Sequence, residues 1–503
     1  MEGLRERHGP IAIWDRFFCE FARFTLLLHI QENNMLGSKK SEALLANIRN
    51  GLSMSRREKL SLIINLSIPS MLAQLTTVMM FFIDAGMVGH LGAEASASIG
   101  LIESTAWLIG SVLSASAIGF SVQVSHFIGA NDFAKARQVF RHAYICEIIL
   151  SLFLLAIGVA IHAALPIWLG GDAAIAGNSS SYFFVFSLTI PFLMLFHLSC
   201  DMLKCTGNMQ LASAMSVLLC VLDVGFNYVF IYLFGLGVIG AALGTAMAYI
   251  CTSLPVTWMT TCRNKILALK LDTIPFHWVW DYVIKSAKIS FPIAVQSILM
   301  SGAQIVSTLI VAPLGNIAIA ANSFAITAES LCYMPGYGIG DAATTLVGQT
   351  YGAARKDLCT SFARMTVGLG MLVMAFMGAV MYVFAPEMIG LLSPVEAIRT
   401  LGTTVLRIEA FAEPFFAASI VVYSICVGAG DTLRPAIMNL ISMWCVRLTL
   451  AAWLARDYGL KGVWTAMAIE LTFRGSLFLY RLFRGNWLKG LAEKPAVETL
   501  QTT

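Results

Sequence analysis

Apolar runs of about 20 or more residues recur along most of this chain, and they limit its possible folds more than any other feature. As a helix, each run is long enough to cross a hydrocarbon core of about 30 Å. Only 12% of the residues are charged, whereas a soluble globular chain carries roughly a quarter. We therefore predict an all-α membrane protein for which the bilayer is the solvent.

Glycine, proline and charged residues divide the apolar runs into twelve predicted transmembrane helices. They lie near residues 60–88, 96–127, 139–165, 180–203, 210–234, 238–261, 285–312, 317–349, 365–385, 400–427, 433–455 and 459–482. Basic residues precede the first span and follow the even-numbered spans: Arg56, Arg57, Lys59, Lys135, Arg137, Lys204, Arg263, Lys265, Lys270, Arg355, Lys356 and Arg434. The positive-inside rule then predicts both termini in the cytoplasm, and Arg399, Arg456 and Lys461 are the exceptions on the outer side. We expect a multi-pass protein of the cytoplasmic (inner) membrane.

The two halves of the chain repeat each other. Pro69 pairs with Pro292 at an offset of 223 residues (292 − 69 = 223), and three further anchors share that offset: Leu91-Gly92 with Leu314-Gly315, Gly129-Ala130 with Gly352-Ala353, and Gly207 with Gly430. Six spans per half is an even number, so the repeats run parallel and the substrate path is expected between two pseudo-symmetric six-helix lobes.

The repeat predicts five regions. These are an N-terminal cytoplasmic or interfacial extension (1–55), an N-lobe (56–262), a cytoplasmic inter-lobe loop (263–284), a C-lobe (285–483) and a cytoplasmic tail (484–503). Charges at Asp15, Arg16, Glu20 and Arg23 interrupt the stretch 11–31, so we do not interpret it as a signal peptide. It is either a dispensable extension or an amphipathic interfacial helix.

Several motifs together carry a family resemblance. They are SIPSMLAQ and FIDAGMVGHLG in the first span, FPIAVQ and IVAPLGNIAIAAN in the seventh, AESLCYMPGYGIGDAATTLVGQTYGA in the eighth, and FAEPFF, VGAGDT and MWCVR around the tenth and eleventh. The chain resembles the MATE (multidrug and toxic compound extrusion) transporters, especially their prokaryotic DinF-like branch, over about residues 55 to 485. The resemblance implies an antiporter that expels amphipathic, often cationic compounds while H⁺ or Na⁺ flows inward.

Asp84 is the most informative single residue of the first span. A carboxylate inside a membrane span costs about 2.5 to 3.5 kcal/mol on insertion scales and therefore needs a compensating role. Polar residues at heptad-like spacing, including Gln74 and Thr77, place it on one polar stripe of the helix. Pro69 lies fifteen residues earlier, about 22 Å along a helix, where a bend could move the carboxylate. The alternative is that Asp84 merely lies near the outer headgroups.

Asp223 and Asn227 lie four residues apart on the fifth span, and thus on one face, with Thr245 following on the sixth. The resemblance implies that the coupling ion acts at the acid of the first helix near such polar residues. Family members often carry Asn first and Asn or Asp second, so this order is a departure. We predict a cation-coupling site at Asp84, Asp223, Asn227 and Thr245, supported by Pro69, Gln74 and Thr77. Hydrogen bonding between neighbouring helices is the structural alternative.

Acids elsewhere are weaker candidates for function. Glu329, in AESLCYMPG, and Glu103 occupy similar places on the second helix of each half and could contact a cationic substrate. Glu409 and Glu413 of the tenth span are expected to be solvated acids at a span end. The NorM-like branch carries its carboxylate on the seventh helix, where alignment at APLG puts Met300 in this chain, a further possible substrate contact.

We expect no enzyme and no cofactor other than the coupling ion, with H⁺ favoured over Na⁺, although Na⁺ could bind at Asp84, Asp223 and Asn227. The expected partners are lipid and small-molecule substrates, with no nucleic acid, and the expected state is a monomer. Two alternatives remain. A flippase or exporter of a lipid-linked or metabolite substrate would need a cationic cavity, and a membrane enzyme would show His, Asp or Cys clusters at one interface.

Overall fold

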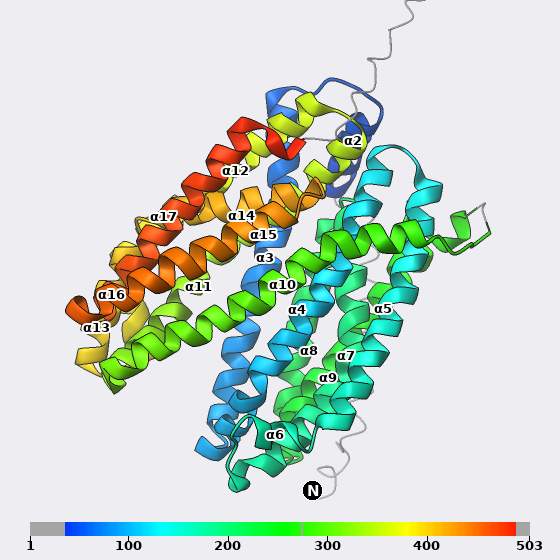
Figure 1. The fold of residues 1–503 in the computed structure, drawn as a ribbon. Coiled ribbons are helices and arrows are strands. Elements are labelled where there is room, and N and C mark those ends of the chain that lie inside the picture. Colours follow the sequence, from blue (N-terminus) through cyan, green and yellow to red (C-terminus); the bar gives the residue numbers. More distant parts are fainter. Residues whose placement is uncertain (1–35, 273–274, 489–503) are drawn as a thin grey trace, which may run out of the picture.

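The computed structural model describes residues 36–272 and 275–488, and the regular elements in this part of the chain are all helical. Two bundles of long helices join at the end where α2 lies and diverge away from it (Figure 1). The expectation for the stretch 11–31, and for most of the basic tail, falls outside the described residues.

The N-lobe contains α3 (Arg56–Gly89), α4 (Ala93–Gly129), α5 (Phe133–Ile161), α6 (Leu165–Trp168), α7 (Ala173–Cys205), α8 (Met209–Tyr228) and α9 (Gly237–Trp258). Single π-helical turns extend α8 (Val229–Leu233) and α9 (Met259–Arg263). A shorter helix, α2 (Leu36–Arg49), precedes this lobe, and a 3₁₀ turn (Leu269–Leu271) lies in the inter-lobe loop.

The C-lobe contains α10 (Trp280–Val311), α11 (Asn316–Gly352), α12 (Lys356–Leu392), α13 (Glu396–Glu409), α14 (Glu413–Gly428), α15 (Leu433–Ile441), α16 (Leu448–Tyr458) and α17 (Leu460–Arg484). A π-helical segment (Ser442–Arg447) joins α15 to α16, and 3₁₀ turns follow α10 (Ala312–Leu314) and α17 (Asn486–Leu488).

Each of the twelve predicted spans overlaps a helix or a pair of consecutive helices. In the described part of the chain, ten helices are long and apolar enough to cross a membrane, and the α13–α14 pair, bent by 59°, counts as an eleventh if it is one span. The remaining predicted span is α17. It is long enough, but it carries Glu470 and Arg474, which form a buried ion pair at 3.2 Å. That pairing makes the two charges tolerable inside the bundle.

Two helices belong to both lobes by their contacts. α3 packs against α8 of its own lobe and against α11 of the other. Its repeat counterpart α10 packs against α4, where Ser290 Oγ donates to the carbonyl oxygen of Ser116. The later part of α10 packs against α15 and α16. The two first helices of the repeats therefore cross between the lobes.

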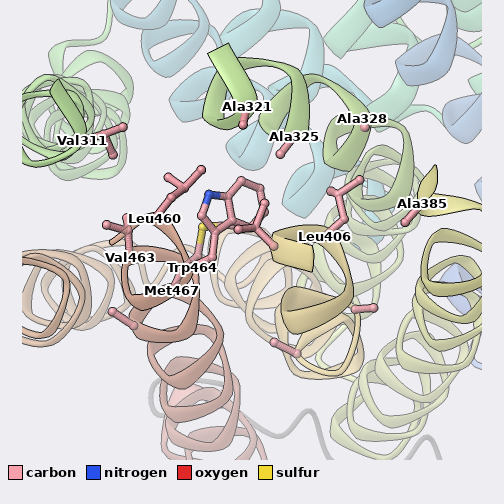
Figure 2. Packing of buried hydrophobic residues seen from close by; sticks show 14 of the residues in the cluster. Val311, Ala321, Ala325, Ala328, Ala385, Leu406, Leu460, Val463, Trp464 and Met467 are labelled. Atoms are coloured by element: carbon pink, nitrogen blue, oxygen red, sulfur yellow. The ribbon is translucent and has the colours of Figure 1, made fainter. Parts of the chain in front are cut away.

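The core of the C-lobe is built on small residues of α11. Trp464 of α17 is 1% exposed and packs toward Ala321 and Ala325, as Figure 2 shows. Its indole Nε1 donates to Asn322 Oδ1 at 2.9 Å. Small residues on one helix let a large aromatic side chain on another approach closely, which is the packing that membrane interiors favour.

The lobes touch backbone to backbone at the α2 end, in a contact that we call the seam. A Cβ atom added to Gly129 of α4 would lie 2.0 Å from the carbonyl oxygen of Gln349. One added to Gly352 of α11 would lie 1.9 Å from that of His126. Only glycine permits this approach. Gly129 and Gly352 are one of the four anchor pairs of the repeat, so the seam gives a physical reason for that anchor.

Candidate functional site

Asp84, Asp223 and Asn227 meet in the N-lobe. The Asn227 side-chain amide donates to Asp84 Oδ1 at 3.0 Å and to Asp223 Oδ2 at 3.1 Å. Asp223 is fully buried and Asn227 is 2% exposed. One amide therefore links carboxyl groups from α3 and α8, and the two carboxyl groups also interact directly. Asp84 thus points at α8, although it lies only five residues before the end of α3.

Local sequence explains how these side chains come together. Asp223 and Asn227 lie one helical turn apart on α8, so both face the same neighbour. On α9, Gly244 lets the backbone approach Asn227 closely, because a Cβ atom there would lie 2.0 Å from Asn227 Oδ1. The next residue, Thr245, interacts with the Asp223 carboxyl group. All four residues of the predicted coupling site therefore lie together.

The site contains polar atoms with unused hydrogen-bonding capacity. Asp223 Oδ1 and Asn227 Oδ1 are buried and have no hydrogen-bond partner within the described chain. A buried oxygen without a donor is costly, and a proton or a small cation would satisfy it. The arrangement can therefore hold a proton between two carboxyl groups, or a cation among carboxyl, amide and hydroxyl oxygens.

The residues predicted to support this site make contacts of their own, and their supporting role stays a prediction. The Gln74 side-chain amide donates to Asp341 Oδ2 of α11 at 3.4 Å, across the lobes. The Thr77 hydroxyl donates to the carbonyl oxygen of Ala73 in its own helix. Pro69 lies inside α3, which runs through it without a break. The polar stripe on α3 thus serves more than one neighbour, and only its last member reaches the coupling site.

A charged cluster that the sequence does not predict joins the lobes near the seam. Lys204 Nζ of α7 lies 3.3 Å from Asp201 Oδ1 on the same helix and 3.2 Å from Asp341 Oδ2 on α11. The sequence predicts for Lys204 only a role in setting topology. The signal that could have found Asp341 is its place inside the quoted motif GYGIGDAATT, where an acid interrupts an otherwise small and apolar helix.

The acids of the tenth span lie in the interior of the C-lobe. Glu409 and Glu413 were expected to be solvated, but both are fully buried, and their carboxyl oxygens have no hydrogen-bond partner within the described residues. They lie beside Glu329, which is 4% exposed. The expectation was wrong because α13 and α14 bend at this point, which turns a presumed span end into the interior of the C-lobe.

The other two candidates for substrate contact have different surroundings. Glu103 is exposed, and its Oε1 accepts a hydrogen bond from Trp107 Nε1 one turn later on α4. Met300 of α10 is half-buried against a small cluster formed by Ala303, Met443 and Leu448. Met300 belongs to the other lobe, whereas Trp107, the partner of Glu103, lies 5.0 Å from Phe81 of α3, measured between ring centroids. The proposed contact of both residues with substrate stays a prediction.

Comparison with known proteins identifies the family. The MatE family model matches the chain twice, at residues 69–229 and 292–453, and the two matches begin at Pro69 and Pro292, the first anchor pair of the repeat. A probable multidrug resistance protein NorM of Thermotoga maritima is 25% identical over 434 residues, covering 85% of this chain and 93% of the relative. The protein of the same name from Pseudomonas aeruginosa is 28% identical over 440 residues, covering 82% and 86%.

Solved structures share the fold. A MOP superfamily transporter of Pyrococcus furiosus superposes with a TM-score of 0.80 at 21% identity, covering 86% of this chain and 97% of its own. The Vibrio cholerae MATE transporter VcmN gives a TM-score of 0.80 at 15% identity, covering 90% and 99%. These matches do not separate the DinF-like branch from its relatives, and that assignment stays a prediction. The family model covers more than half of the chain, which therefore belongs to the MatE family of membrane transporters.

Proposed function

We propose that this protein is a cation-coupled antiporter that exports amphipathic or cationic small molecules across the cytoplasmic membrane by alternating access. It works as a monomer with both termini in the cytoplasm. The coupling ion binds at Asp84, Asp223, Asn227 and Thr245, and H⁺ is favoured over Na⁺. Inward movement of the ion down its gradient drives outward movement of the substrate.

The observation that carries this proposal is the hydrogen-bonded group of two carboxyl side chains and one amide. The Asn227 side-chain amide donates to Asp84 at 3.0 Å and to Asp223 at 3.1 Å. Ionisable side chains inside a membrane are costly and mark ion pathways in many transporters. Because Asp84 and Asp223 come from different helices, occupancy of the site changes how tightly α3 is held to α8.

A proton is the simplest ion for this site. Two buried carboxylates that interact directly repel each other when both are charged, and one proton removes that repulsion. A sodium ion would need several oxygen ligands in addition to the carboxyl groups. Asn227 Oδ1 and the Thr245 hydroxyl are two such groups beside Asp223. An Na⁺-coupled cycle at the same residues is therefore the direct alternative.

The charge pattern supports the orientation. The basic residues Arg56, Lys135 and Arg355 all lie at the α2 end, where the lobes meet at the seam. The positive-inside rule assigns that end to the cytoplasm. In this arrangement the lobes are closed on the cytoplasmic side, and they diverge toward the opposite side (Figure 1).

The names of the relatives support a drug-like cargo, and one charged cluster of this chain supports a cationic one. The relatives from Thermotoga maritima and Pseudomonas aeruginosa are named probable multidrug resistance proteins. In this chain, Asp201 and Asp341 share a single cation, Lys204, so the cluster between the lobes carries one excess negative charge when all three groups are ionised. A flippase for an anionic lipid-linked substrate would need the opposite sign there.

The test is transport in vesicles that contain the purified protein. A pH gradient and an Na⁺ gradient are imposed separately, and movement of a fluorescent cationic dye is followed. We expect dye movement that depends on the pH gradient in the absence of Na⁺ and that is lost in Asp84→Asn. Movement that follows only the Na⁺ gradient would reassign the ion. Movement that neither gradient affects would contradict the antiporter.

A further inference from the structure

The segment before the first membrane-spanning helix is packed into the protein. Leu45 and Ile48 of α2 are 1% and 0% exposed, and Leu44 is 6% exposed. These residues recur on one face of a short helix whose other face carries charged residues such as Glu42. α2 is too short to be stable in water by itself, so its apolar contacts hold it in place.

On the N-lobe side, α2 contacts the ends of several helices. A Cβ atom added to Gly207, which follows α7, would lie 2.1 Å from Leu45 Cδ1. The Asn131 side-chain amide, between α4 and α5, donates to the carbonyl oxygen of Arg49 at 3.0 Å. Lys265 Nζ lies 2.7 Å from Glu42 Oε2. α2 therefore fits against the N-lobe through both apolar and polar contacts.

The same segment also contacts the C-lobe. Leu44, Leu45 and Ile48 share one apolar cluster with Leu346 of α11 and Phe362 of α12, both fully buried. Immediately after α2, the carbonyl oxygen of Leu52 accepts a hydrogen bond from Arg355 Nη1, at the start of α12. One short helix thus buries its apolar face against both lobes at once.

This geometry ties the burial of α2 to one arrangement of the lobes. The seam lies beside α2, where Gln349 Nε2 of α11 donates to the carbonyl oxygen of Cys205 at 2.7 Å. If the lobes separate at this end, α2 can stay with only one of them. The contacts of Leu45 and Ile48 with the other lobe are then lost, and apolar surface is exposed to water.

We propose that α2 is a clamp on the cytoplasmic side, which stabilises the arrangement with the seam closed and must detach from one lobe before the seam opens. This rests on the proposed function, because it assumes that the transporter alternates between two arrangements. The clamp sets how often the seam opens. This control of opening would come from α2, which precedes the first membrane-spanning helix.

The test uses a native cysteine as a reporter. Cys205 lies at the seam, is 6% exposed, and its thiol donates to the carbonyl oxygen of Ser121. Opening of the seam would expose this thiol to N-ethylmaleimide, and mass spectrometry of the peptide that carries it gives its labelling rate. Cys426, fully buried inside the C-lobe, is the internal control for general loosening of the fold.

The variant is the double substitution Leu45→Ala and Ile48→Ala. Leu45 and Ile48 contact both lobes only while the seam is closed, so removing their side chains weakens that arrangement more than the open one. We therefore expect Cys205 to be labelled about tenfold faster or more. The matched control is Leu52→Ala. Its side chain is 53% exposed and its carbonyl contact with Arg355 is kept, so labelling should stay at the wild-type rate.

Faster labelling of Cys205 in the double variant, with Cys426 still protected, supports the clamp. Unchanged labelling of Cys205 in the folded double variant overturns it, and so does equal acceleration in Leu52→Ala. If the double variant is not recovered folded, Ile48→Ala alone is compared, with a smaller acceleration expected. The dye assay on the wild-type protein is separate. Loss of transport there would reject the antiporter without changing what the labelling says about α2.

Discussion

Asp84 and Ser307 occupy equivalent places in the two repeats, because they are separated by the repeat offset of 223 residues (307 − 84 = 223). The carboxyl group of Asp84 accepts a hydrogen bond from Asn227. Ser307 places an uncharged hydroxyl group at the same position of the other repeat. The repeats thus share a backbone plan and differ in chemistry. An ion site built from Asp84 therefore belongs to one lobe.

Asp84→Asn should abolish ion-coupled dye transport and leave the protein folded. The asparagine side-chain oxygen can still accept the hydrogen bond from Asn227 Nδ2, so the geometry is kept while the charge is lost. The dye assay in vesicles, together with thermal unfolding, measures both effects. Ser307→Ala, the matched change in the other repeat, should transport at the wild-type rate. Coupled transport by Asp84→Asn would contradict the proposed site.

Gly244→Ala should damage the same site from the opposite side. The added methyl group would meet Asn227 Oδ1 at 2.0 Å, and this overpacking costs about 1 to 3 kcal/mol, so Asn227 must move away from both acids. We expect dye transport to fall at least severalfold. Gly225→Ala is the control, because a Cβ atom there meets nothing within 4 Å. Equal transport by both variants would show that close approach of α9 is not needed.

At the scale of one helix, Pro69 and Pro292 test whether bending of α3 matters. Each proline lies inside a long helix and removes one backbone hydrogen bond, which permits a bend. Only α3 carries the carboxyl group. Pro69→Ala should therefore slow coupled dye transport severalfold and make α3 stiffer, while Pro292→Ala has the smaller effect. Equal slowing by both variants would show that transport depends on how α3 and α10 cross between the lobes, and not on movement of Asp84.

The long helices were predictable from the sequence, and α2 was not. Membrane spans are recognisable as long apolar runs, because a helix that crosses the hydrocarbon core needs such a run whatever its neighbouring helices are. α2 is short and carries charged residues such as Glu42, and only its contacts with both lobes bury Leu45 and Ile48. Burial that depends on tertiary contacts has no signature in a single run of sequence.

The candidate site was predictable to a similar, partial extent. Asp223 and Asn227 lie one turn apart, so their shared face followed from helical spacing alone. The side chains that join the lobes could not be placed that way. The polar stripe of α3 predicts that Gln74 supports the Asp84 site, but it does not predict that its amide donates to Asp341 of the other lobe. Spacing along a helix tells which residues share a face, and it does not tell which helix that face meets.

At the scale of the whole molecule, the contacts between the lobes are concentrated at one end. Thr345 Oγ1 of α11 donates to the carbonyl oxygen of Lys204, and His126 contacts the carbonyl oxygen of Gly428 at 2.8 Å. The only ionic contact from N-lobe to C-lobe among the described membrane-spanning helices is that between Lys204 and Asp341. These contacts must be exchanged for others if the seam opens.

Asp341→Asn tests how much that ionic contact contributes. Lys204 keeps its partner Asp201 on the same helix, so the substitution removes the attraction between the lobes and leaves no cation unpaired. The side chains of Lys204 and Asp341 are 28% and 29% exposed, and a pair of this kind contributes about 1 kcal/mol. The closed seam should then lose about fivefold in population relative to the open one.

The labelling rate of Cys205 measures this change, and an increase of about fivefold is expected. Lys135→Met is the matched control, since it removes an ion pair with Asp132 that lies within the N-lobe. It should leave Cys205 protected. If Asp341→Asn also leaves the labelling rate unchanged, the seam is held by the backbone contacts of Gly129 and Gly352 and by α2. The charge on Asp341 would then be free to act on a cationic substrate.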